Sequence, residues 1–118
     1  MSAAEMRKEF REKVQELKDL TEDYRILFQR MNQTQMELDY FIGSFVRTAI
    51  QTPEKVGFKV SMQLAEWKIK SYYTSTDEWK EKTMAFHKAK DEWYAKQQQI
   101  KFLEMEIEFL LICLRTEK

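Results

Sequence analysis

The chain has 118 residues, of which 43% are hydrophobic and 34% are charged, and its formal net charge is zero. Two glycines and one proline are too few turn residues for a sheet protein, and the hydrophobic content is too high for a disordered chain. These values predict a single all-α domain, and they exclude a strongly basic or acidic protein.

The first predicted helix spans residues 3–50 and carries a heptad pattern, the mark of a coiled-coil seam. One series is Phe10, Leu17, Tyr24, Met31, Leu38 and Phe45, and a second is Val14, Phe28, Ile42 and Ala49. Thr21 and Gln35 interrupt the seam, as polar residues that fix register do. For Gln35, a solvent-exposed position at the edge of the seam is an equal alternative. Gly43 lies within the pattern and predicts close backbone packing or a slight bend.

The second helix is predicted over residues 53–73. Proline disfavours helical geometry in the residue before it but suits the first helical position, so Thr52 is expected to be the N-cap of a helix that begins at Pro53. Its hydrophobic residues form two stripes, one of which is Val56, Val60, Leu64 and Trp67 and the other Phe58, Met62, Ile69 and Tyr73. This arrangement predicts a helix packed between partners.

A run of capping residues follows the second helix, and Ser75 with Glu78 forms a capping-box pattern. We therefore expect a break there and a third helix over residues 76–115. The alternative is that the second and third helices are continuous, with the threonines only lowering the helix propensity.

The third helix has the clearest heptad pattern in the chain. The first series is Trp79, Phe86, Trp93, Ile100, Ile107 and Leu114, and the second is Ala89, Leu103 and Leu110. A further hydrophobic stripe means that this helix needs more than one neighbour; its members are Phe102, Met105, Phe109 and Ile112. We predict a homo-oligomer whose copies meet through Trp93, Ile100, Leu103, Ile107, Leu110 and Leu114.

The short connection at Thr52 and Pro53 predicts that the first helix is antiparallel to a later helix, of its own chain or of a neighbouring one. The predicted fold class is therefore all-α, as a long-helix hairpin or a three-helix coiled-coil assembly.

Little in the sequence could support catalysis. Cys113 is the only cysteine and His87 the only histidine, and neither glycine lies in a phosphate-binding loop. Cys113 lies among aliphatic residues, as an inert buried thiol does. Acidic residues alternate with basic ones at helical spacing, which is typical of a solvated face. We predict that the chain is not an enzyme and has no metal, cofactor or small-molecule substrate.

No segment approaches the ~18 apolar residues of a membrane-spanning helix, and the first ten residues are charged rather than apolar. A lone cysteine fits a reducing compartment. We expect a cytoplasmic protein that does not bind membranes.

The basic residues are concentrated in the middle of the chain. Residues 48–101 carry ten lysines and seven acidic residues, with aromatic residues interleaved. Lysines contact phosphates and exposed rings stack on bases, which together allow single-strand binding, although a solvated lysine face is the alternative. Tyr72 and Tyr73 are adjacent, so at least one ring should be exposed. The candidate nucleic-acid contacts are Lys68, Lys70, Tyr72, Tyr73, Lys80 and Lys82.

A lysine-rich helix ends in paired tyrosines, a polar break follows, and the segment from Lys96 to Leu111 is KQQQIKFLEMEIEFLL. In these features residues 64–115 resemble the UvsY family of phage recombination mediators, although Thr74 stands where that family usually has glycine. The resemblance implies single-stranded DNA binding through the positions of Lys68, Lys70, Tyr72 and Tyr73. It also implies ring-like homo-oligomers held by C-terminal helices, and loading of a RecA-type recombinase onto strands coated by single-strand binding protein.

Two functions are therefore expected. The first is a non-enzymatic recombination mediator that binds single-stranded DNA, in the host cytoplasm if the chain is phage-encoded. The alternative is a coiled-coil homo-oligomeric adaptor or inhibitor that binds another protein and no nucleic acid.

Overall fold

The computed structural model describes residues 2–57 and 66–116, and within those ranges it contains no strand. The elements are α1 (Ala3–Gln51), the short 3-10 helix η1 (Pro53–Val56), α2 (Glu66–Thr74) and α3 (Asp77–Thr116). The predicted all-α class is confirmed. The described chain divides into two compact units, one within residues 1–29 and 90–118 and the other within residues 30–89.

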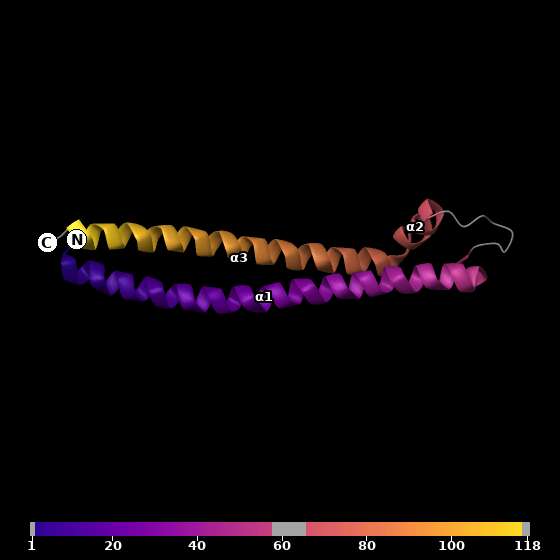
Figure 1. Cartoon of the computed structure of the whole chain (residues 1–118), viewed down its shortest axis with the longest axis horizontal. Coiled ribbons are helices and arrows are strands. Elements are labelled where there is room, and N and C mark those ends of the chain that lie inside the picture. Colours follow the sequence, from indigo (N-terminus) through magenta and orange to yellow (C-terminus); the bar gives the residue numbers. More distant parts are fainter. Residues whose placement is uncertain (1, 58–65, 117–118) are drawn as a thin grey trace. The chain divides into compact units, whose positions relative to one another are not determined.

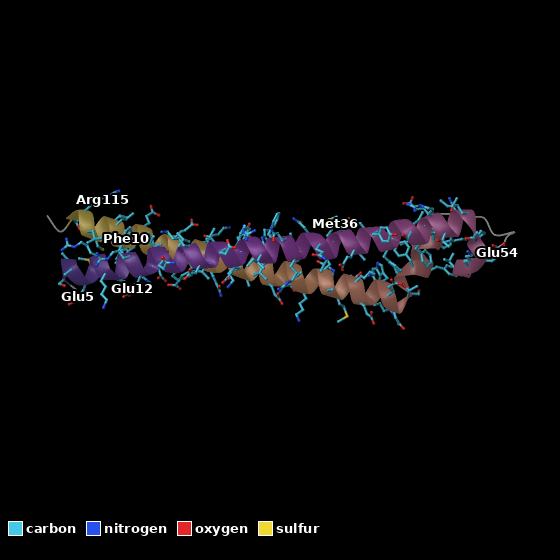
Figure 2. The ribbon with its side chains drawn as sticks, turned by 90° about the horizontal axis from the view of Figure 1, so that it is seen from below. Glu5, Phe10, Glu12, Met36, Glu54 and Arg115 are labelled. Carbon is cyan, nitrogen blue, oxygen red and sulfur yellow. The ribbon has the colours of Figure 1, made fainter. Side chains whose placement is uncertain are left out.

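In the first unit, the N-terminal half of α1 pairs with the C-terminal half of α3 (Figure 1). Lys13 of α1 forms an ion pair with Glu106 of α3. The Oδ2 atom of Asp23 lies 3.9 Å from the Nζ atom of Lys96. Because the residue numbers fall along α3 as they rise along α1, these helices are antiparallel, as predicted, and both belong to one chain. Figure 2 accordingly shows Glu5 and Arg115 at the same end of the pair.

The heptad seam forms the core of this helix pair. Leu103 and Leu110 of the second predicted series are buried, and Met6, which the predicted seam omitted, is buried as well. The ring of Trp93 lies 5.7 Å from that of Tyr24 and 6.0 Å from that of Phe28, measured between centroids. Burial of each large side chain contributes about 1.5–3 kcal/mol, so this face holds the two helices together.

The ion pair between Lys13 and Glu106 predicts a stability that depends on pH. The hydrogen bond that Lys13 donates to Glu106 is the main cause that raises the pKa of Lys13 above its ordinary value of 10.5. Because the folded-state pKa is raised, the stabilisation is complete below pH 10.5 and is lost as the pH rises through the raised value. The side chain of Glu106 is 45% exposed, so solvent screening limits the effect to about 0.2–1 kcal/mol.

We therefore expect Lys13→Gln to be less stable than the wild type at neutral pH, and the difference to vanish above the raised pKa. Denaturant titrations across this range measure it, with Lys18→Gln, an exposed lysine of the same helix, as the control. If the difference in stability between Lys13→Gln and the wild type did not change with pH, the ion pair with Glu106 would not be its cause.

The second unit has a small core where α1 meets α2. Ala49 and Ile69 are buried there, and the side chains packed against them are Phe45, Val46, Val56 and Tyr73. The ring of Tyr73 meets that of Phe45 edge to face, with centroids 5.8 Å apart. Ile69 and Tyr73 are four residues apart, so one face of α2 packs on α1.

The predicted second helix is wrong as a continuous helix. Thr52 takes the N-cap position and Pro53 begins η1, but this element ends at Val56, and the φ of 91° at the following Gly57 is left-handed. An α-helix cannot continue through that conformation. The hydroxyl of Thr52 does not cap the helix either, because it donates to the carbonyl of Thr48. The rest of the predicted helix up to residue 65, including Phe58, Val60, Met62 and Leu64, lies outside the described residues.

The break between α2 and α3 falls at residues 75 and 76, so these two helices are not continuous. The cap of α3 is Thr76, whose hydroxyl oxygen accepts the backbone N–H of Trp79 at 3.2 Å. The predicted capping box at Ser75 and Glu78 is wrong by one residue, because the hydroxyl of Ser75 donates back to the carbonyl of Ser71. The hydroxyl of Thr76 also donates to the carbonyl of Tyr73, which links the two helix ends.

The two glycines predict opposite effects of alanine. At Gly57 the left-handed backbone makes any Cβ costly, so Gly57→Ala should destabilise by about 1–2 kcal/mol. At Gly43, inside α1, nothing lies within 4 Å of an added Cβ, so the predicted close packing is absent there. Gly43→Ala should therefore stabilise by about 1 kcal/mol through helix propensity. Urea denaturation of both variants measures this, and changes of the same sign would contradict it.

Candidate functional site

The predicted nucleic-acid contacts lie on α2 and on the first turns of α3, in the second unit. Lys70 and Lys80 are exposed, whereas Lys68 and Lys82 are half-buried. Lys80 and Lys82 are two residues apart, as are Lys68 and Lys70, so the two members of each pair point to different sides of their helix. The four lysines therefore do not share one surface.

The paired tyrosines separate as predicted. Tyr73 is half-buried and packs on Phe45, so its ring belongs to the core. Tyr72 is 37% exposed, and the edge of its ring lies beside Gly57, because a Cβ added at Gly57 would be 3.5 Å from its Cε1 atom. Of the two rings, that of Tyr72 is the more exposed.

Trp67 is an aromatic residue of this site that the sequence did not predict there. Its side chain is 68% exposed, and the Nζ atom of Lys68 lies 5.5 Å from the ring centroid, at cation–π distance. The sequence prediction placed Trp67 on a packed stripe of the second helix. The usable signal was Ile69 with Tyr73, because a helix that turns this pair inward turns Trp67 outward.

We call Trp67, Lys68, Lys70 and Tyr72 the α2 surface. It is the part of α2 that lies away from the core residues Ile69 and Tyr73, and it places the exposed ring of Trp67 between the two lysines, one on each side. Acidic residues balance it, because residues 66–82 contain four lysines and also Glu66, Asp77, Glu78 and Glu81. The neighbourhood therefore has no net positive charge, and any attraction of phosphates depends on local lysine contacts.

A second exposed feature lies on α3 in the first unit, and we call it the outer stripe. The exposed fractions are 68% for Phe102, 67% for Met105, 65% for Phe109 and 52% for Ile112. On its side toward α1, the outer stripe borders an open apolar groove that Met6 and Leu110 also line. This is the further stripe that the sequence predicted to need another neighbour, and α1 of the same chain does not cover it.

The residues predicted to join copies of the chain lie instead in the filled seam. Leu103 and Leu110 are buried, while Trp93, Ile100, Ile107 and Leu114 are half-buried. Trp93 contacts Tyr24 and Phe28 of the same chain. Their role between copies stays a prediction, because the structure shows them packed within a single chain.

Within the described residues, no group of three His, Cys, Asp or Glu side chains could hold a metal ion. No helix in the described part of the chain is long and apolar enough to cross a membrane. His87 is exposed beside the ring of Phe86, with centroids 5.6 Å apart, and Cys113 is half-buried in the other unit.

The chain is thus an all-α protein with a long antiparallel helix pair and two exposed features, the α2 surface and the outer stripe. Comparisons with protein-family models, curated proteins and solved structures find no match to this chain.

Proposed function

We propose that this chain is a non-enzymatic accessory protein of phage-type recombination or replication that binds single-stranded DNA. The observation that carries the proposal is the α2 surface, where Trp67 is exposed beside Lys68 and Lys70. The opposite face of α2 is fixed on the core by Ile69 and Tyr73, so the surface is presented on a supported helix. The resemblance to UvsY mediators adds a recombinase and a single-strand binding protein as partners, and a cytoplasmic location.

In this proposal Trp67 and Tyr72 stack on bases, and Lys68 and Lys70 contact phosphates. Each phosphate contact lowers the logarithm of the affinity by roughly 0.7 per tenfold rise in salt, so two contacts give a slope of roughly 1.4. The balancing acidic residues add no attraction. We therefore expect weak binding that is readily lost when salt is added.

Fluorescence anisotropy with a labelled oligothymidine strand at low salt tests the proposal. Trp67→Ala should weaken binding by about 1–3 kcal/mol, or roughly 5- to 150-fold, because one stacking platform is lost. The matched control is Tyr40→Ala, which removes a ring that is 75% exposed on α1 but has no lysine within four residues. Lys70→Gln should reduce the salt slope by roughly 0.7.

Two results would refute nucleic-acid binding at this surface. One is the absence of wild-type binding at low salt, and the other is equal affinity of the Trp67 and Tyr40 variants. Circular dichroism of each variant must first match that of the wild type, since a loss of helix would also abolish binding.

A specific observation favours the second candidate function, that of a coiled-coil adaptor. The outer stripe offers a second heptad face on α3 after the first has been filled by α1. Such an apolar face binds the apolar faces of helices from other chains, and it offers no charged groups that would contact nucleic acid. The adaptor alternative therefore predicts no oligonucleotide binding at any salt concentration, which the same titration measures.

A further inference from the structure

The spacing of the residues in the outer stripe indicates that its binding partner is an α-helix. Phe102 and Phe109 are seven residues apart, and Met105 and Ile112 follow each of them by three. This is the heptad spacing of the filled seam, repeated on another face of α3, and it fits an α-helix laid alongside. Two largely exposed rings and their neighbours leave on the order of 400 Å² of apolar surface, as much as the largest patch on a typical monomer.

The charges beside the outer stripe favour a second copy of α3. Lys101 and Glu108 lie on one edge of the stripe, and Glu106 and Cys113 lie on the other. In a parallel pair of helices in register, a residue on the first edge faces the residue five positions later on the partner's second edge. Lys101 then faces Glu106 of the second copy, and symmetry makes this contact twice. Glu108 faces the uncharged Cys113, so no like charges meet.

Glu106 is able to take part in this contact. It already binds Lys13 of its own chain, yet 45% of its side chain remains exposed. A carboxylate has two oxygens and accepts more than one lysine. The zero net charge of the chain adds no general repulsion between copies.

The antiparallel arrangement is less favourable. Placing Met105 opposite Phe109 of the copy would cover all four apolar residues, but it would bring Lys101 toward Arg115. It would also bring Glu108 toward Glu108 of the copy, and like charges at the edges of a helix pair are destabilising.

We propose that two copies of this chain associate through the outer stripe of α3, parallel and in register, with Lys101 of each copy bound to Glu106 of the other. Each residue of the stripe meets its own counterpart across a two-fold axis, as in the commonest class of homodimer. The seam with α1 stays within each chain. This proposal stands independently of nucleic-acid binding by the α2 surface.

Sedimentation equilibrium of the full chain tests the association. The wild type should have twice the 14.4 kDa mass of one chain. The double variant Phe102→Gln with Phe109→Gln should be monomeric, with unchanged helical content, because glutamine is a good helix former. Lys101→Glu should weaken the dimer several-fold, whereas Lys90→Glu, the same reversal at an exposed position away from the stripe, should not. A monomeric wild type, or a mass above that of two chains, would overturn the proposal.

Cysteine cross-linking tests the direction of the two helices. In a Cys113→Ser background, Met105→Cys and Ile112→Cys should both form disulfide-linked dimers on mild oxidation, because each lies beside its counterpart. Glu104→Cys, which is exposed on another side of α3, should not. Cross-linking at residue 105 without cross-linking at residue 112 would indicate antiparallel pairing and would overturn the parallel arrangement.

Discussion

Replacing Trp93 by alanine is expected to lower the free energy of unfolding by about 3–5 kcal/mol. Trp93 lies within the first unit against the rings of Tyr24 and Phe28, at 5.7 and 6.0 Å. The substitution therefore removes one of the two tryptophans of the seam together with two aromatic contacts, each worth about 0.5–1.5 kcal/mol beyond the area that it buries. Urea denaturation at one fixed protein concentration measures the loss, since any association of copies would make stability depend on concentration.

The matched control is Trp93→Phe, which keeps a ring in place. The indole Nε1 atom of Trp93 is buried and has no hydrogen-bond acceptor among the described residues. Phenylalanine removes this donor, and with it a penalty of about 1–3 kcal/mol that offsets the smaller ring. We expect Trp93→Phe to cost less than half as much as Trp93→Ala. Equal losses would show that the contacts with Tyr24 and Phe28 do not stabilise the pair.

The heptad pattern predicted the fold well because it records which face of a helix is covered. Leu103 and Leu110 are buried as the pattern required, and the first half of α1 is antiparallel to α3. The pattern does not record which chain covers the face, because a seam filled within a hairpin and one filled by another copy have the same spacing. For that reason the residues expected between copies were found packed within one chain.

Glycine marks the limit of the helix predictions. Gly43 and Gly57 both lie inside hydrophobic patterns of helical period, yet α1 continues through Gly43 whereas η1 ends just before Gly57. A helix tolerates one glycine at about 1 kcal/mol, so the surrounding packing decides whether it continues. Gln35 shows the same dependence on context. Its side chain is exposed to solvent at the edge of the seam, so it does not occupy a core position that fixes the register.

At the α2 surface, the sequence prediction named Lys68, Lys70 and both tyrosines without distinguishing the exposed ring, and it left out Trp67. The hydrophobic residues of the second helix surround it on several sides, so their periodicity did not identify its inner face. The contacts of Ile69 and Tyr73 with α1 decide which face is buried, and contacts between distant segments are not visible in local periodicity. Once those contacts are known, the exposure of Trp67 follows from helix geometry.

Aspartate at Leu110 is expected to break the helix pair of the first unit, whereas aspartate at the preceding residue, Phe109, is expected to leave it folded. Leu110 is 6% exposed and faces the seam, so a carboxylate there would be buried without a partner. Leaving a charge buried and uncompensated costs about 3–5 kcal/mol, in addition to the lost packing. Phe109 is 65% exposed on the outer stripe, where a carboxylate stays in water.

The two variants place the same residue at adjacent positions of α3, so helix propensity and charge are matched and only the face differs. Far-UV circular dichroism during heating should show a large loss of thermal stability for Leu110→Asp and a cooperative transition for Phe109→Asp. Sedimentation should then give a folded monomer for Phe109→Asp. Two variants with equal stability would mean that α1 does not cover the seam, and a folded, dimeric Phe109→Asp would mean that the outer stripe does not join the copies. This pair therefore distinguishes loss of the fold from loss of association, which a substitution in the seam alone cannot do.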